Sequence, residues 1–593
     1  MLEKIFSVID QVFMSQPPEI KLFEKKYPLF PFESAYQGQN ESIEALINLD
    51  RSVLCSHTGS GKTAVYLTAA LTTRYRTLIL APRNFLQDQI EEYNKYFSDE
   101  VIFSLKGKLK HCRFGAIDYS LRAAPCEARY FDDSRKNYFF THNGVEYIYP
   151  CPDCEYEKQK TKAISFYNDG RGVLVLNQGN FWMLSSEMAY PEFVIIDEAD
   201  EFVRAITQGF FIKIDEMKMI EDAAYKKEDF EFVKLFKKAD AFVEEANEGS
   251  SRGAALISKL LQYYVAALLE KSETLSQHIK SLEEKLSLAG GNDEELKKEL
   301  VMCRNAKNAC ENKLHKVRFY LKNVDRVFLY KRKEHVGIYV EMFTTEEETV
   351  LRLFRHAKKL CISTATPFEV REFKQVSYEI PFRAKVIYAP VGKLTYWEVY
   401  RKGNTDLLRK AVVDYIIPIH DYVSALLGSK TKTPIHCGSL SRHGTFIADI
   451  LKNNGKQVLL HKEGHLDETV KMFREKDYDF LCVVAAEYGA DWYWCPLQFV
   501  VKVPYADASD PREQAIRKRF SEEEWKKRYD WDALSRLVQA CGRNARKPEQ
   551  FSVTVILDQK FEEVYARYYH LVPQWFKNRL IWLSSTPPPE PGA

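Results

Sequence analysis

Residues 51–70 constrain the fold more than any other part of this 593-residue sequence. A short apolar run, 51–55, leads into Ser56-His-Thr-Gly-Ser-Gly-Lys-Thr63, and a helix-like stretch, 64–70, follows. A glycine-rich loop between a buried strand and a helix is the context in which backbone N–H groups cradle phosphates. The segment therefore predicts a phosphate-binding loop on a parallel α/β sheet.

Each position of this loop has an expected task. Gly59 and Gly61 let the backbone approach the phosphates, Lys62 supplies a charge for the β and γ oxygens, and Thr63 ligates magnesium. Ser56 stands where the motif has its first glycine. The expected nucleotide-binding residues of the loop are Thr58, Gly59, Ser60, Gly61, Lys62 and Thr63.

A second motif ends an apolar run in acids, Phe193-Val-Ile-Ile-Asp-Glu-Ala-Asp200. Asp197 can hold magnesium through water, and Glu198 can polarise the water that attacks a phosphate. Two acids after a strand can also be the N-cap of a helix. With the glycine-rich loop upstream, we favour the interpretation as a nucleotide-hydrolysis motif.

Short β-rich runs between turn residues occur in two regions of the chain. They predict two parallel α/β sheets of similar kind, formed by 51–55, 77–81, 172–176 and 193–196 and by 433–437, 480–484, 499–503 and 552–557. Between these regions, 205–340 is mostly helical. Apolar residues at heptad-like spacing before and after the break at 289–293 predict an antiparallel helical hairpin, with Asn292 and Glu295 as a capping box. This hairpin can also be a packing arm without chemistry.

Four cysteines, Cys112, Cys126, Cys151 and Cys154, lie within 43 positions. Twelve cysteines in the chain are too few for a disulfide scaffold, so closely spaced ones are expected to bind metal in a reducing compartment. Four thiolates suit tetrahedral zinc or a 4Fe-4S cluster, and their spacing does not choose between these.

Charge and hydropathy exclude other classes. The formal net charge is +2, so a nucleic-acid surface must be a local basic groove. Basic residues gather near the cysteines, and they are a candidate wedge or a solvated face (Lys106, Lys108, Lys110, Lys158, Lys160 and Lys162). No apolar run approaches the length of a membrane span, and Glu3 and Asp10 do not fit a signal peptide. We expect a soluble intracellular protein without a membrane partner, in cytoplasm or nucleoid, or in a nucleus.

The ordered motifs resemble those of superfamily 2 helicases, and finer features resemble the iron-sulfur branch of the XPD/DinG type. The motifs are 56–63, 197–200, Ser363-Thr-Ala-Thr366 and Gln539-Ala-Cys-Gly-Arg-Asn-Ala-Arg546. The finer features are 30–33 with Tyr36 and Gln39, 105–108 before the first cysteine, Asn177, Glu487-Tyr-Gly-Ala-Asp491 and 557–561. Two positions depart from the branch, because Asp200 stands where histidine is usual and Pro367 where an aliphatic residue is common.

The resemblance implies two RecA-like motor domains with an inserted Fe-S domain and a helical Arch-like insertion. The expected bounds are 1–104, 165–204 and 341–367 for the first motor domain, 105–164 for the cysteine-rich domain, 205–340 for the insertion, 368–582 for the second motor domain and 583–593 for a disordered tail.

The resemblance also assigns residues. Gln39 and Asp491 join the nucleotide site, and Gln539 orients the γ-phosphate or water. Arg543 and Arg546, three apart, are expected on one face of a helix that begins near Trp531, from which they stabilise charge on the γ-phosphate. Single-strand contacts are expected from Arg83 and from Tyr488, Trp492 and Trp494, which are equally good candidates for core aromatics.

The resemblance thus implies an ATP- and Mg²⁺-dependent DNA helicase that moves 5′ to 3′ on single-stranded DNA and opens duplex at single-strand junctions. It favours the 4Fe-4S cluster over zinc, because the cysteines lie between the loop and the acidic motif. The alternatives are a structural or clamp-like motor subunit, whose helical insertion binds protein partners, and a zinc-stabilised RNA helicase. DNA repair, replication, transcription and defence against mobile elements all remain open.

Overall fold

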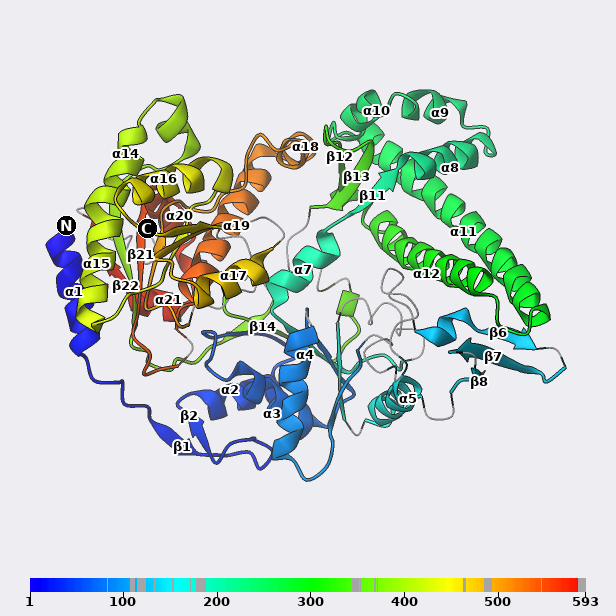
Figure 1. Ribbon diagram of the computed structural model, residues 1–593, viewed down its shortest axis with the longest axis horizontal. Coiled ribbons are helices and arrows are strands. Elements are labelled where there is room, and N and C mark those ends of the chain that lie inside the picture. The colour runs from blue at the N-terminus through cyan, green and yellow to red at the C-terminus, as the bar shows by residue number, and fades with distance from the viewer. Residues whose placement is uncertain are drawn as a thin grey trace. The chain divides into compact units, whose positions relative to one another are not determined.

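The computed structural model describes all residues except 83, 107–111, 113, 115–123, 133, 144, 152–153, 171, 178–187, 344–350, 352, 367–369, 371, 462–464, 485–492, 546 and 585–593. The chain forms two compact units. The first contains Met1–Ala69, Cys361–Asp507 and Glu523–Ala593, and the second contains Ala70–Leu360 and Ala508–Glu522. Figure 1 labels the elements of both units.

The first motor sheet has seven strands in the order β15-β3-β14-β10-β4-β9-β5. The pairings β10–β4, β4–β9, β9–β5 and β15–β3 are parallel, with Ile195 opposite Ile79 and Ile79 opposite Val175. Most of its strand residues are buried, as expected for a sheet covered on both faces. The strand bounds are β3 Arg51–Cys55, β4 Thr77–Leu80, β5 Ile102–Ser104, β9 Val173–Leu176, β10 Phe193–Asp197, β14 Lys359–Thr364 and β15 Lys374–Val376.

The helices that accompany these strands are α2 Gln39–Asn48, α3 Lys62–Thr73, α4 Asn84–Glu91, α5 Glu155–Asn168 and α7 Ala199–Thr207, and a small pair of strands, β1 Leu22–Glu24 and β2 Ser34–Tyr36, precedes them.

The second motor sheet is also seven-stranded and parallel, in the order β18-β19-β17-β20-β21-β16-β22. Alternate residues of each strand enter different cores, because side chains alternate between the faces of a strand. Ile387 and Val555 pack with the helices at 2–14, 417–427 and 445–453, whereas Tyr388 and Ile556 pack with those at 522–541, 560–567 and 574–579. The strands are β16 Ala384–Gly392, β17 Thr433–His436, β18 Val458–Leu460, β19 Phe480–Val483, β20 Leu497–Val500, β21 Ser552–Asp558 and β22 Leu580–Trp582.

Helices cover both faces of this second sheet. The N-terminal helix is one of them, since Phe6 stacks on Tyr422 of α15 at 4.1 Å and Asp10 accepts a hydrogen bond from the Tyr422 hydroxyl. The helices are α1 Leu2–Met14, α14 Thr405–Lys410, α15 Ile417–Leu427, α16 Thr445–Asn453, α17 Leu466–Glu475, α19 Glu522–Cys541, α20 Lys560–Arg567 and α21 Gln574–Arg579.

The helical insertion is built on a three-stranded antiparallel sheet and a long helical hairpin. Its elements are β11 Phe210–Lys213, α8 Ile214–Tyr225, α9 Phe230–Phe236, α10 Ala239–Ala246, α11 Ser251–Leu288, α12 Glu294–Leu321, β12 Val327–Tyr330 and β13 Gly337–Met342. The Cys310 thiol on α12 contacts the Leu268 carbonyl on α11. Farther along α11, Glu283 pairs with Arg304, which comes before Cys310 in α12. The partners run in opposite directions, which confirms the expected antiparallel hairpin.

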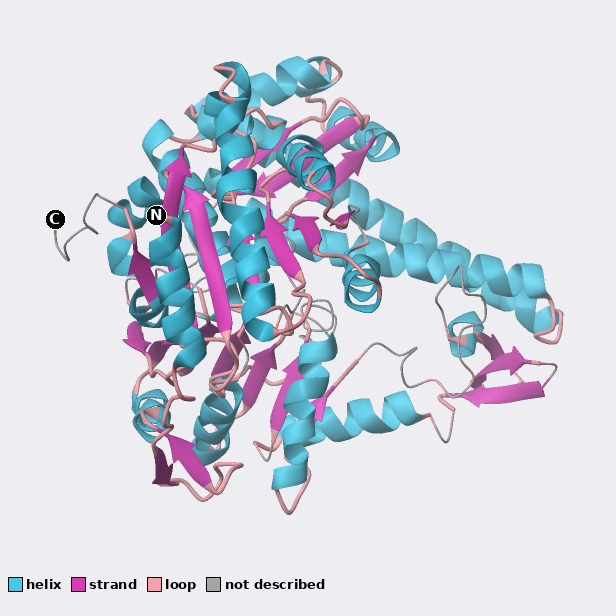
Figure 2. Ribbon diagram, turned by 60° about the vertical axis from the view of Figure 1, so that its left-hand side comes forward, coloured by secondary structure: helices cyan, strands magenta, loops and turns pink. Residues whose placement is uncertain are grey.

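A small antiparallel sheet in the cysteine-rich segment packs on the end of this hairpin, as both ribbon views show (Figures 1 and 2). Its strands are β6 Tyr130–Asp132, β7 Asn137–His142 and β8 Val145–Tyr149. Tyr130 and Phe139 share one apolar cluster with Leu282, Leu286 and Leu300 of the hairpin. The buried Arg304 guanidinium donates to the carbonyls of Glu127 and Arg129. The cysteine-rich segment and the insertion therefore form one packed body.

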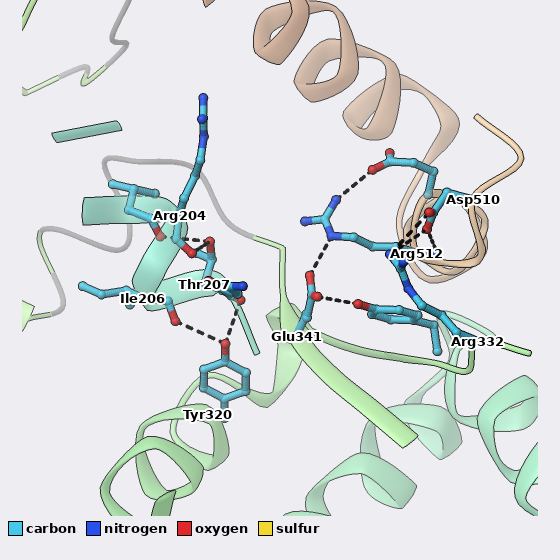
Figure 3. A network of polar contacts seen from close by, with 12 residues as sticks. Arg204, Ile206, Thr207, Tyr320, Arg332, Glu341, Asp510 and Arg512 are labelled. Atoms are coloured by element: carbon cyan, nitrogen blue, oxygen red, sulfur yellow. Dashed lines mark hydrogen bonds and ion pairs between the residues drawn. The ribbon is translucent and has the colours of Figure 1, made fainter. Parts of the chain in front are cut away.

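Helix α18, Pro511–Arg519, belongs in sequence between β20 and α19 but packs on the insertion. Figure 3 shows the polar network that holds it. Arg512 Nε donates to Glu341 Oε2 at 2.6 Å, and the Tyr330 hydroxyl donates to Glu341 Oε1 at 2.6 Å. Arg332 pairs with Asp510 at 3.3 Å. A largely buried carboxylate thus anchors a segment from the other half of the sequence.

The fold class expected from the sequence is confirmed, and three local expectations are wrong. The N-cap of α12 is Asp293, whose side chain accepts from Glu295 and Leu296 N–H, because Asn292 is still part of the turn. Helix α19 begins at Glu522, nine residues before Trp531. Strand β20 spans 497–500 in place of 499–503. In the described part of the chain, no helix is long and apolar enough to cross a membrane.

Candidate functional site: a nucleotide loop with acidic and arginine motifs

The predicted phosphate-binding loop joins β3 to α3. Gly59 and Gly61 have φ angles of +84° and +83°, a region that is costly for residues with a Cβ. A Cβ on Gly61 would lie 2.9 Å from Gln39 Nε2. Since α3 begins at Lys62, the loop presents N–H groups at the positive end of a helix. The local structure is the one that anionic phosphates need.

Lys62 is buried and turned into its own loop. Its Nζ donates to the Ser56 carbonyl at 2.9 Å and to the His57 carbonyl at 3.3 Å. Burial raises the pKa of the neighbouring Cys55 thiol to about 11, although the charge of Lys62 opposes this rise. The thiol is therefore protonated near neutral pH, and it leaves the positive charge of Lys62 available to a phosphate.

Hydrogen bonds with Tyr378 and Gln39 brace the loop from outside. The Ser56 hydroxyl donates to the Tyr378 carbonyl at 2.8 Å, and the Tyr378 hydroxyl donates to the Ser60 carbonyl at 3.0 Å. Gln39 Nε2 also donates to Ser60 O, at 3.1 Å, while Gln39 Oε1 accepts from Tyr36 N–H. Gln39 thus lies beside the loop. Ser56, which replaces the first glycine of the motif, links the loop to Tyr378 by a hydrogen bond.

The acidic pair lies at the end of β10 in the second unit. Asp197 is the last strand residue and is buried. Glu198 precedes α7 with φ 48° and ψ 57°, a left-handed conformation that is uncommon for glutamate, and its side chain makes no cap hydrogen bond. Strained backbone of this kind occurs at functional sites. Glu198 therefore occupies the N-cap position of α7 without capping it through its side chain, and its chemical role stays a prediction.

The arginine motif departs from the predicted helix face. Helix α19 ends at Cys541, so Arg543 lies in the turn that follows, where its N–H donates to the Ala540 carbonyl at 3.3 Å. Asn544 pins this turn, because its Nδ2 donates to the Val553 carbonyl of β21. Gln539, in the last turn of α19, is half-buried. The charge of Arg543 contributes to the lowered pKa of the buried His436, after the larger effect of burial.

Other predicted site residues lie outside the described residues: Arg546, Asp491, Arg83, Tyr488, Trp492 and the Asp200 side chain. Thr58 and Thr63 are half-buried at either end of the loop, and Tyr66 contacts the Thr63 hydroxyl at 3.4 Å. Trp494 packs on Phe473 of α17. Of the basic residues near the cysteines, Lys106 pairs with Asp88 and Glu91, and Lys162 pairs with Glu100.

The four cysteines of the predicted metal site share one cluster. Cys126 and Cys151 are buried beside Phe140, and Cys112 and Cys154 pack against them. Cys154 N–H donates to the Cys151 carbonyl at 2.9 Å, and Cys154 is the N-cap residue of α5. All four thiols are free of disulfides, which leaves the donor set available to a metal group. Over the described part of the chain, no set of three or more potential ligands is placed to hold a metal ion.

Two residues at the loop had no signal in the sequence. Tyr378 lies 322 positions from Ser56, and Trp575 lies 210 positions from Ala365, whose carbonyl it contacts. Asp558 falls within the predicted closing strand without a predicted role, yet its carboxylate accepts from three backbone N–H groups, of Leu394, Lys560 and Val503. Only folding brings these partners together, so no local pattern could reveal them.

A phosphate loop, a strand ending in acids, and a second parallel sheet with an arginine motif define a two-sheet nucleotide-hydrolysing motor. The comparisons with known proteins agree. The DEAD/DEAH box helicase family model matches residues 36–119, and the helicase C-terminal domain model matches residues 430–579. No curated protein matches the sequence.

Solved structures align with most of this chain, and one of them shows the same fold. One, described as an XPD helicase, aligns with a TM-score of 0.52 at 13% identity and covers 92% of this chain and 98% of its own. Xpd4 of S. tokodaii aligns at 12% identity over 92% of this chain and 99% of its own, with a TM-score of 0.46. The two family models support the resemblance to superfamily 2 helicases, and the alignment with the XPD helicase structure shows that this chain shares its fold.

Proposed function

We propose that this chain is an ATP-dependent DNA helicase that moves 5′ to 3′ along single-stranded DNA and opens duplex at single-strand junctions. The observation that carries the proposal is the loop 56–63, with two left-handed glycines and Lys62 at the start of α3. The helicase matches on both sides of the insertion support a motor of two lobes. DNA as the substrate and the polarity follow the resemblance alone.

Each residue of the motifs has a proposed role in ATP binding or hydrolysis. Lys62 exchanges its two loop carbonyls for β and γ oxygens of ATP, and Gln39 stays beside the loop to contact the nucleotide. Thr63 and Asp197 hold Mg²⁺, and Glu198 polarises the attacking water. Gln539, Arg543 and Arg546 stabilise charge on the γ-phosphate, and Asp491 completes the nucleotide site. Closure and release of the lobes then drive stepping along the strand.

The four clustered cysteines are proposed to hold a 4Fe-4S cluster, with zinc as the alternative. Thiolates in a buried, aromatic-lined group suit an iron-sulfur cluster. When bound, the group would brace the segment structurally. Anaerobic purification, visible absorption and analysis of iron, sulfide and zinc test this proposal, with Cys126→Ser as the variant and Cys303→Ser, on α12, as the control. A colourless protein with stoichiometric zinc would overturn it.

The function itself is tested by ATPase and unwinding assays on matched duplexes. We expect ATP hydrolysis to rise with single-stranded DNA, and a 5′-tailed DNA duplex to be opened in preference to 3′-tailed DNA or RNA duplexes. Lys62→Ala should abolish hydrolysis, whereas Glu198→Gln should bind ATP and not turn it over. Lys226→Ala, a change of an exposed insertion residue, is the control.

Different failures point to different functions. Hydrolysis without strand separation, with an assembly that tolerates Lys62→Ala, would favour a clamp-like subunit whose insertion binds protein partners. Preferential opening of RNA by a zinc-containing protein would favour an RNA helicase. Near-normal hydrolysis by Glu198→Gln would contradict the role given to that carboxylate.

A further inference from the structure

Trp575 lies on the last helix, α21, and is 5% exposed. Its Nε1 donates to the Ala365 carbonyl at 3.0 Å. Ala365 directly follows β14 within Ser363-Thr-Ala-Thr366, where Thr366 is itself held by the Thr364 hydroxyl. Because an indole has one donor, this bond fixes the ring to the end of β14.

The same indole contacts the phosphate loop. Its ring lies 4.9 Å from the His57 ring at 74°, an edge-to-face packing, and His57 is flanked by Phe382 at 4.5 Å. His57 is buried, and its carbonyl accepts from Lys62. A displacement of Trp575 would therefore be transmitted to the backbone that now holds the loop lysine.

The arginine motif meets the indole from a third direction. A Cβ on Gly542 would lie 3.4 Å from Trp575 Cη2, so the ring packs directly against the glycine backbone. Arg543 is the next residue along the chain. The position of the indole thus limits where the arginine turn can lie relative to the loop and to β14.

From these three contacts we propose that Trp575 is a positioning residue for ATP hydrolysis, which sets the arginine turn against the phosphate loop. The inference rests on the proposed function. Trp575 does not touch the reacting atoms; it acts through His57, Ala365 and Gly542. All four residues lie in the first compact unit.

Contacts around α21 also hold the Trp575 indole in one orientation. The Arg579 guanidinium lies over Phe382 at 4.4 Å and near Trp575 at 5.2 Å, a cation–π arrangement. Burial lowers the pKa of Arg579, which the charge of Glu379 opposes. Glu379 is also bonded by Asn578 of the same helix. The helix is therefore tied to the segment that contains Tyr378, which braces the loop.

The test compares Trp575→Phe with Trp582→Phe. Phenylalanine retains an aromatic ring and loses the N–H and the Cη2 contact, whereas Trp582 packs on Tyr388 at 4.4 Å in the same core. We expect Trp575→Phe to lower the DNA-stimulated kcat about tenfold while the KM for ATP changes less than about threefold. Trp582→Phe should keep kcat within twofold, a margin of about 0.4 kcal/mol.

A second variant leaves Trp575 in place. Gly542→Leu extends a side chain beyond the Cβ position that already lies in contact with the indole, 3.4 Å from Cη2, and should lower kcat. In the double variant with Trp575→Phe this added loss should largely disappear, because the contacted Cη2 is gone. Strict additivity of the two losses would overturn the inference.

The outcomes separate the inference from the function on which it rests. If Trp575→Phe lowers only the melting temperature and leaves kcat within twofold, while Lys62→Ala abolishes hydrolysis, the inference alone fails. If the native chain shows no hydrolysis that depends on Lys62, the proposed function fails and the inference falls with it.

Discussion

Three of the buried histidines in the unit that contains the second motor sheet have a lowered pKa, and they make its stability depend on pH. They are His420 on α15, His436 on β17 and His443 just before α16. Burial lowers the pKa of each from 6.5 to about 4, and nearby cations, Lys456, Arg543 and Lys502 respectively, add to the effect. The folded unit therefore holds all three rings neutral at pH values where the unfolded chain protonates them.

The sign and size follow from this difference. Between about pH 6.5 and 4 the unfolded state binds more protons, so the free energy of unfolding falls as the pH falls through this window. At pH 5.5, one unit below the unfolded pKa, the loss is about 1.4 kcal/mol per histidine, or roughly 4 kcal/mol for three. The contribution is fully present above pH 6.5.

The assay is hydrogen exchange of peptides from β17 and β19 at pH 7.5 and 5.5, corrected for intrinsic exchange rates. His443 Nε2 donates to the Leu394 carbonyl, and His443→Gln retains an N–H donor without a titrating group. This variant should reduce the pH difference by about a third. His570→Gln, at an exposed position, is the control. Equal stability at the two pH values, or an unchanged difference in His443→Gln, would refute the reasoning.

Three further substitutions have expected outcomes. Gly61→Ala places a Cβ against Gln39 at a left-handed backbone position, so ATP affinity should fall at least about tenfold. The matched control is Gly290→Ala, where the φ is +63° but the Cβ would point into open space. Equal ATP affinity in both variants would count against the clash. Arg304→Met removes the buried guanidinium that pairs with the half-buried Glu283 and should loosen the hairpin from residues 127–130 by about 3 kcal/mol in hydrogen exchange. Adding Glu283→Leu should recover much of that loss, and no recovery would contradict a charge effect. Gly209→Ala would place a Cβ 1.5 Å from the Val340 carbonyl and should remove exchange protection from β11 and β13, a loss above about 3 kcal/mol, whereas retained protection would show that this backbone can shift.

The sequence predicted the parts of the site whose residues are contiguous. The loop 56–63 and the acids after β10 are local patterns, and the structure forms them on the expected strand ends. Parallel strands also follow from buried apolar runs, although β20 begins two residues early. Domain bounds, polarity and the metal group stay predictions.

Two of the wrong predictions concern helix boundaries, where neighbouring residues compete to cap or to begin the helix. Asn292 and Asp293 are both good caps, but Gly290 and Gly291 prolong the turn with left-handed backbone, and Asp293 is the first residue free to cap α12. Helix α19 begins nine residues before the predicted start, because 522–530 consists mostly of charged residues and carries little apolar helical periodicity. The tie of Ser56 to Tyr378 crosses 322 positions, a distance at which one sequence carries no signal.

The packing of α18 on the insertion has a consequence for protein engineering. A truncated motor made by excising 205–340 would remove Glu341's neighbours on β12 and β13 and leave Pro511–Arg519 without its docking surface. Ala515 and Ile516, which are buried in the native chain, would then be exposed to solvent on a basic segment that has lost its packing partner. A minimal version must therefore replace 508–522 with a short loop as well, because the insertion is discontinuous in sequence.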